Sequence, residues 1–68
     1  EITVMPAGVR LNKKTNEYEG FAKTSDGKEF KGTHKRSGTD DTGDRKVAEA
    51  DALGKAKRYA ASKNKKKK

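Results

Sequence analysis

The stretch EYEGFAKTSDGKEFKGTHK, residues 17–35, holds two short strand-like segments on either side of Asp26-Gly27. Asp-Gly between two such segments is the strongest short-range signal for a β-hairpin. We therefore predict strands over residues 17–24 and 28–35. A two-residue turn at Asp26-Gly27 would pair Ser25 with Lys28.

A third strand is predicted upstream of this hairpin. The segment VRLNK, residues 9–13, alternates apolar and polar side chains, as a half-buried strand does. The KTN that follows, residues 14–16, suits a three-residue loop with asparagine in the left-handed conformation, which would pair Lys13 with Glu17. Pro6 excludes a central strand in the segment that precedes residue 9, so residues 1–8 are predicted to form an N-terminal arm or edge segment.

The second half of the chain reads as a loop and a helix. Residues 36–44, RSGTDDTGD, are turn formers, and Asp44 suits a helix N-cap. Residues 45–63 are rich in alanine, lysine and glutamate, which favour a helix. We predict an α+β domain over residues 9–62, a three-stranded antiparallel sheet packed on one C-terminal helix. A disordered lysine tail, residues 63–68, would follow.

The two predicted turns assign each strand residue to a face of the sheet, because paired residues share a face. One face would collect the bulky apolar side chains of the strands, namely Val9, Leu11, Phe21 and Phe30. The helix would cover that face with Val47, Leu53, Ala56 and Ala60. The opposite face would be exposed, nearly free of acids at its centre, and would hold Arg10, Asn12, Tyr18, Gly20, Ala22, Lys31, Thr33 and Lys35. Two small residues at the centre, Gly20 and Ala22, would admit the backbone of a ligand.

Composition narrows the classes of function. Hydrophobic residues are 28% of the 68 residues, and charged residues are 41%. The hydrophobic residues supply enough apolar surface to pack one sheet against one helix. There is no cysteine, no apolar run long enough to span a membrane and no signal peptide. His34 stands alone and is predicted to be structural. We expect a cytoplasmic or nucleoid protein that is not an enzyme, with no metal, cofactor, membrane or small-molecule substrate.

The charge of the chain points to a polyanion. The net charge is +8, and the tail at residues 63–68 supplies five of the 18 basic residues, which leaves 13 against 10 acidic residues. Basic, amide and hydroxyl groups on an exposed sheet face can contact phosphates and base edges. We predict binding of double-stranded DNA through Arg10, Asn12, Tyr18, Lys31, Thr33, Lys35, Arg36, Lys65 and Lys66.

The chain resembles the arm-binding N-terminal domains of phage-type tyrosine integrases and the AP2/ERF DNA-binding domains of plants. The matching segments are Gly8-Val9-Arg10, YEGFAKTSDGKEFKG at residues 18–32 and DRKVAEADALGKA at residues 44–56. The resemblance implies that the sheet enters the major groove of DNA, in a phage or mobile-element context. The chain departs from the pattern in its longer loop at residues 36–44 and in its lack of tryptophan.

Two alternatives remain open from the sequence. The chain could be a small phage-type interaction module or inhibitor that binds a host protein, with the lysine tail giving only non-specific attraction to polyanions. It could also be an RNA- or ribosome-associated accessory protein, in which Tyr18 stacks on a base.

Overall fold

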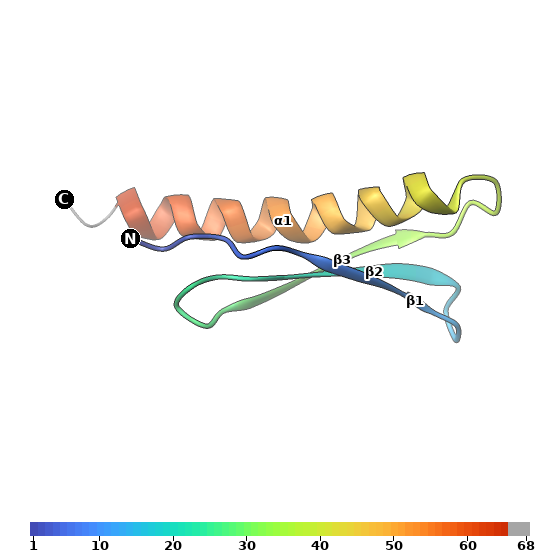
Figure 1. Cartoon of the computed structure of the whole chain (residues 1–68), viewed down its shortest axis with the longest axis horizontal. Coiled ribbons are helices and arrows are strands. Elements are labelled where there is room, and N and C mark those ends of the chain that lie inside the picture. The colour runs from blue at the N-terminus through green and yellow to red at the C-terminus, as the bar shows by residue number, and fades with distance from the viewer. Residues whose placement is uncertain (66–68) are drawn as a thin grey trace.

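The computed structural model describes residues 1–65. Strands β1 (Gly8–Asn12), β2 (Glu17–Lys23) and β3 (Glu29–Lys35) form an antiparallel sheet in the order β1-β2-β3. Helix α1 (Asp41–Lys65) follows and runs along one face of that sheet, so the domain has two layers (Figure 1). The predicted β-β-β-α order and α+β fold are confirmed.

The hairpin between β2 and β3 differs from the prediction by one residue. Thr24, not Ser25, lies opposite Lys28: its amide donates to the Lys28 carbonyl oxygen at 2.9 Å, and residues 25–27 form the loop. Gly27 has φ = 94°, in the left-handed region that favours glycine. The Thr24 hydroxyl bonds to Asp26 within the loop and accepts from the Lys28 amide at 3.2 Å. These local bonds set the longer loop.

The hairpin between β1 and β2 is also longer by one residue. Asn12 pairs with Glu17 around a four-residue loop, residues 13–16, and Asn16 has φ = 60°. The side-chain oxygen of Asn12 accepts from the backbone amides of Lys14 and Thr15 at 3.0 and 3.4 Å. This Asx-type bonding turns the chain at Asn12, one residue earlier than predicted.

The two one-residue differences turn β2 over while leaving β1 and β3 as predicted, because a one-residue slip exchanges the faces of a strand. Val9, Leu11 and Phe30 face the helix as expected. The prediction for β2 is wrong: Phe21 is on the face away from the helix, and the helix-facing residues are Tyr18, Gly20, Ala22 and Thr24, all buried.

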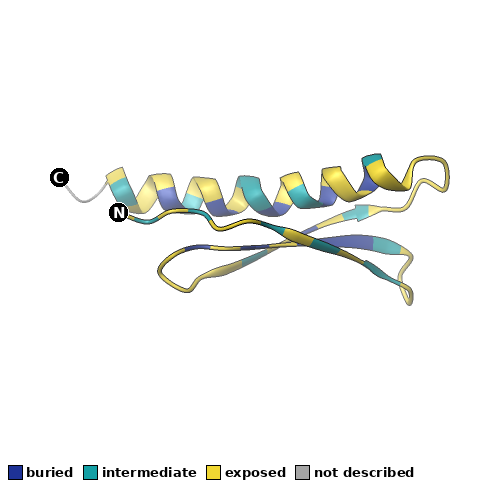
Figure 2. Cartoon of the chain, viewed as in Figure 1, coloured by how far each residue is buried: buried dark blue, intermediate teal, exposed yellow. Residues whose placement is uncertain are grey.

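Helix α1 packs through a row of small residues. Ala48, Ala52, Ala56 and Ala60 are at most 6% exposed and recur every four residues (Figure 2). Ala48 lies over Gly20 and Ala52 lies over Gly32, and these two glycines are cross-strand partners. A Cβ at Gly20 would lie 2.2 Å from the Ala48 carbonyl oxygen, and one at Gly32 would lie 2.5 Å from the Ala52 nitrogen. The helix backbone therefore rests directly on the sheet.

This close packing corrects three predictions. Gly20 and Ala22 admit the helix rather than a ligand, since both are buried beneath it. Val47 is 48% exposed and does not cover the sheet, and Leu53 packs only at the margin of the core. Ala56 and Ala60 are core residues as predicted.

Both ends of the core carry an aromatic side chain. Tyr18 is 2% exposed, and the guanidinium carbon of Arg45 lies 5.4 Å from its ring centroid. At the other end Phe30 packs on Tyr59 with ring centroids 5.3 Å apart.

The N-terminal arm is an edge segment, as predicted. Met5 donates its amide to the Lys23 carbonyl oxygen at 2.8 Å, and Ser25 donates to that of Thr3 at 2.9 Å. The side chain of Asn64, near the end of α1, accepts from the amide of Ile2 and donates to its carbonyl oxygen. This pair of bonds shows that α1 is ordered past Ser62, so the prediction of a disordered tail is wrong for residues 63–65. Residues 66–68 lie outside the described residues.

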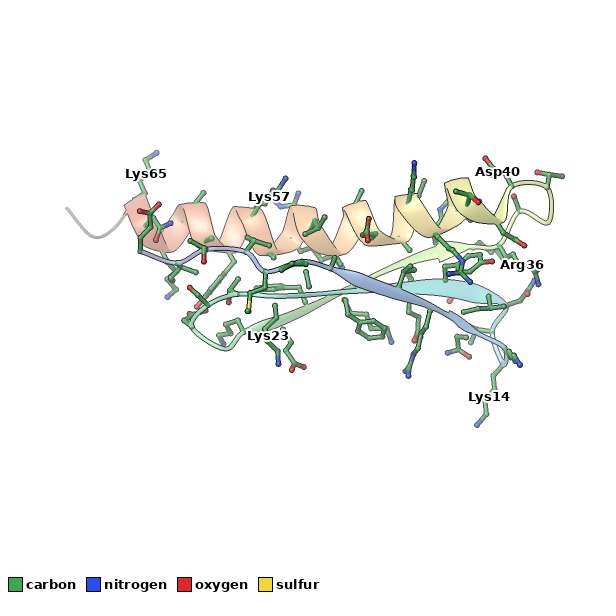
Figure 3. The ribbon with its side chains drawn as sticks, viewed as in Figure 1. Lys14, Lys23, Arg36, Asp40, Lys57 and Lys65 are labelled. Atoms are coloured by element: carbon green, nitrogen blue, oxygen red, sulfur yellow. The ribbon has the colours of Figure 1, made fainter. Side chains whose placement is uncertain are left out.

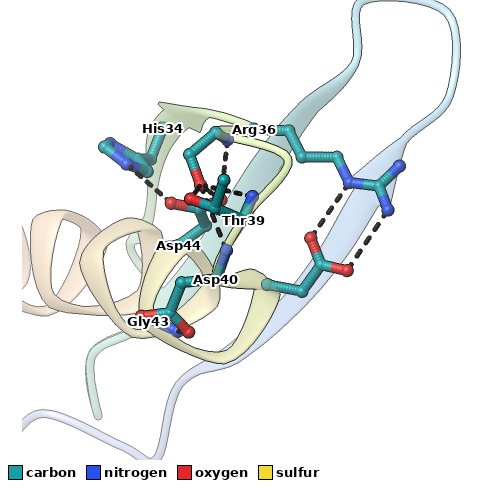
Figure 4. A network of polar contacts seen from close by, with 8 residues as sticks. His34, Arg36, Thr39, Asp40, Gly43 and Asp44 are labelled. Atoms are coloured by element: carbon teal, nitrogen blue, oxygen red, sulfur yellow. Dashed lines mark hydrogen bonds and ion pairs between the residues drawn. The ribbon is translucent and has the colours of Figure 1, made fainter.

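The start of α1 differs from the prediction as well. The N-cap is Asp40, whose carboxylate accepts from the Gly43 amide at 2.9 Å, and not Asp44. Asp44 lies in the first turn and is 6% exposed. It accepts from the Ser37 amide and hydroxyl, each at 2.8 Å, and lies 3.2 Å from Nε2 of His34 (Figure 4). Asp44 thus ties β3 and the loop to the helix, and His34 has the structural position predicted for it.

Asp44 gives a first testable prediction. Hydrogen bonds from Ser37 hold the pKa of the Asp44 carboxyl below its usual value, against the opposing effect of burial. A folded-state pKa below the unfolded one contributes stability above the unfolded pKa, and this is lost as pH falls through the folded pKa. Asp44→Asn is expected to lower the thermal midpoint at neutral pH and to flatten its decline in acid.

The matched control is Asp40→Asn, because asparagine caps a helix as well as aspartate does. Both variants remove one carboxylate from the same end of α1. Thermal unfolding followed by circular dichroism from neutral to acidic pH compares them. Equal midpoints and equal acid profiles in the two variants would contradict the role assigned to Asp44.

Candidate nucleic-acid interface

The side of the sheet away from α1 is called the free face here. By the register, it holds Gly8, Arg10 and Asn12 of β1, Glu17, Glu19, Phe21 and Lys23 of β2, and Glu29, Lys31, Thr33 and Lys35 of β3. Figure 3 shows Lys23 and the loop residue Lys14 extending on this side. Five predicted contact residues therefore share the free face: Arg10, Asn12, Lys31, Thr33 and Lys35.

Tyr18 does not belong to this set. It is 2% exposed and lies on the helix side of β2, where no nucleic acid can reach its ring. The prediction that Tyr18 contacts DNA is wrong, and the cause is the register of β2.

Glu19 occupies the centre of the free face, which the sequence had predicted to be nearly free of acids. Its side chain is 7% exposed because three predicted contact residues surround it. One carboxylate oxygen accepts from Nδ2 of Asn12 at 3.0 Å and lies 3.1 Å from Nζ of Lys31. The other lies 3.4 Å from Nε of Arg10. The hydrogen bond from Asn12 and then that from Lys31 hold the pKa of Glu19 below its usual value.

The Arg10 side chain is fixed on two sides and yet remains 73% exposed. Its Nε meets Glu19, and its guanidinium carbon lies 5.1 Å from the ring centroid of Phe21. These contacts use one edge and one face of the planar group. The fork formed by the terminal nitrogens is the part left for a ligand, and its geometry matches a phosphate or a guanine edge.

The other predicted contact residues do not all lie on the free face. Lys35 is exposed at the end of β3, opposite Glu17. Arg36 forms a bidentate ion pair with Asp41, with N–O distances of 3.0 and 3.2 Å, and this pair holds the Arg36 side chain at the start of α1. Lys65 lies at the C-terminal end of α1 and points away from the sheet (Figure 3). Lys66 lies outside the described residues.

The β1–β2 loop adds exposed lysines at the end of the free face where β3 ends, which is called the cationic end. Lys13 and Lys14 are exposed, and the Arg36 amide after β3 donates to the Asn16 carbonyl oxygen at 3.1 Å. The loop and the end of β3 therefore lie side by side. The sequence prediction did not include these two lysines, although a lysine pair inside a hairpin loop is a visible signal.

The opposite end of the free face is apolar. Met5 is 46% and Phe21 is 38% exposed. They line an open pocket of about 460 Å³ together with Pro6, Phe30, Lys23 and Glu29. The sequence did not predict this feature because it assigned Phe21 to the core.

No protein-family model matches the chain, and no curated protein or solved structure matches it either. Within residues 1–65, no group of three or more histidine, cysteine, aspartate or glutamate side chains could hold a metal ion. That part of the chain also contains no helix with the length and apolarity needed to cross a membrane.

Proposed function

We propose that this protein binds double-stranded DNA through the cationic end of the free face and performs no chemistry on it. The observation that carries the proposal is the cluster of Arg10, Asn12 and Lys31 around the buried carboxylate of Glu19. The buried carboxylate holds Arg10 and Lys31 in place while their side chains stay 73% and 54% exposed, so the cluster positions donors for a ligand. Pre-positioned side chains lose less entropy on binding.

The charge near the cluster favours a phosphate backbone. Arg10 and Lys31 are 73% and 54% exposed at the side chain, whereas Glu19 lies beneath them at 7%. Lys13, Lys14 and Lys35 are exposed around the same end. In the proposed complex, the lysines neutralise phosphates and the Arg10 fork meets a phosphate or a guanine edge.

The test measures the affinity of the full chain for a fluorescent duplex by anisotropy across a salt series. Lys31→Gln/Lys35→Gln is expected to weaken binding roughly 10- to 100-fold and to lower the salt slope by about 2. The control is Lys28→Gln/Lys46→Gln, which removes two exposed lysines from the β2–β3 turn and the outside of α1. Equal losses in the two double variants would argue against a specific site on the free face.

A second candidate function rests on the apolar end of the free face. Exposed Met5 and Phe21 beside an open pocket suit a protein partner, in keeping with an interaction module or inhibitor. In that case DNA binding would depend only on total charge, and the two double variants would behave alike. An RNA duplex used as competitor in the same assay separates an RNA-associated role from a DNA role. A site of action in the cytoplasm or nucleoid, in a phage or mobile-element context, belongs to the same proposal.

A further inference from the structure

The charges of α1 are divided along its length. Its acidic residues, Asp41, Asp44, Glu49 and Asp51, all lie in the first half. From residue 52 to residue 65 the helix has five basic residues and no acidic one. This cationic half is not used by the site on the free face.

Two of these five cations have roles in the fold. Lys55 donates to the Lys31 carbonyl oxygen at 2.9 Å and pairs with Asp51, so it caps the outer edge of β3. Nζ of Lys63 lies 5.8 Å from the ring centroid of Tyr59.

The remaining three cations, Lys57, Arg58 and Lys65, are named the helix ridge. All three are exposed, and within residues 1–65 their side chains form no ion pair or hydrogen bond. Lys57 and Lys65 are eight residues apart, which is about 12 Å along a helix. The residue between them on this side of the helix is Ala61, which has a small side chain.

The helix ridge and the free face lie on opposite sides of the molecule. In Figure 3, Lys57 and Lys65 extend away from the sheet, whereas Lys14 and Lys23 extend in the other direction. The molecule measures 46 × 17 × 15 Å, so its two cationic surfaces are separated only by the thickness of one helix and one sheet.

We propose that the helix ridge binds the phosphate backbone of a second DNA duplex, so that one molecule bridges two duplexes. This inference rests on the proposed binding of a first duplex by the free face. Lysine and arginine side chains on a helix reach phosphates without reading sequence, so the second contact is independent of base sequence. A cationic layer between two duplexes also reduces their mutual repulsion.

The experiment captures a fluorescent duplex from solution on beads that carry an unlabelled duplex, with the full chain added. Binding to a single duplex is measured in parallel by anisotropy. The native chain is expected to capture the second duplex. Lys57→Gln/Lys65→Gln is expected to reduce capture roughly fivefold or more while single-duplex affinity falls much less. The control Lys28→Gln/Lys46→Gln loses the same charge and is expected to retain capture.

Each of the other outcomes contradicts a specific part of the bridging inference or of the proposed function. Single-duplex binding without capture by the native chain contradicts bridging and leaves the proposed function standing. Equal capture by the ridge variant and the control shows that the helix ridge is not the second contact, since every variant keeps the lysines at residues 66–68. If the native chain binds no single duplex, the proposed function and the bridging inference both fail.

Discussion

Replacing Gly20 with alanine is expected to remove a large part of the stability of the protein, about 3 kcal/mol or more. The added methyl carbon would lie 2.2 Å from the carbonyl oxygen and 2.6 Å from the carbonyl carbon of Ala48, and both belong to the helix backbone. A backbone atom cannot move aside as a flexible side chain can, so α1 must lift from the sheet. Overpacking of this kind costs about 3 kcal/mol or more, and a domain of this size has roughly 3–10 kcal/mol in total.

The matched control for this variant is Gly8→Ala in β1. No atom lies within 4 Å of a Cβ built at Gly8, so the methyl group enters open space. Urea unfolding followed by circular dichroism compares the two variants with the native chain. A Gly20→Ala protein as stable as Gly8→Ala would show that the helix does not rest on the Gly20–Gly32 pair.

Replacing Tyr18 with alanine is expected to destabilise the protein by about 3–5 kcal/mol, the usual range for removing a large buried aromatic side chain. Tyr18 is 2% exposed and is the largest of the fully buried side chains among the described residues. The residues that the helix buries against the sheet are mainly alanines. The cavity would therefore have little material to collapse into it.

Phe21→Ala is the control that also tests the register of β2. Phe21 lies three residues further along the same strand, faces the other side and is 38% exposed. Its loss is expected to cost about 1 kcal/mol or less. The register predicted from the sequence reverses this order, since it places Phe21 in the core and Tyr18 on the surface. Chemical denaturation of the two variants therefore distinguishes the two registers directly.

Local signals were enough to predict the number, type and order of the elements. Asp26-Gly27 marked one hairpin, Asn16 marked the other in the left-handed conformation, and the alanine-rich segment marked the helix. The faces of β1 and β3 were also predicted correctly, because Val9, Leu11 and Phe30 alternate with polar residues. The candidate site was predicted in part for the same reason, since Arg10, Lys31 and Lys35 lie on those two strands.

The face of β2 could not be predicted in this way. Both hairpin loops are one residue longer than the shortest turn that fits their sequence, and one residue is enough to exchange the two faces. The extra residue is set by hydrogen bonds from backbone amides in and beside the loops, which the side chains of Asn12 and Thr24 accept. Grouping the largest apolar side chains, Phe21 included, favoured the wrong register because it assumed that a core must be bulky.

A three-stranded sheet followed by one basic helix could be predicted from the sequence alone, because propensities and turn residues act over a few neighbouring positions. The tertiary structure was needed to show that glycine and alanine form the contact between the helix and the sheet. The Gly20–Gly32 pair is useful only when a helix backbone lies against it, and that contact joins residues far apart in the chain. The same choice of face placed Glu19 beneath Arg10 and Lys31, so the candidate site became visible only once β2 was in register.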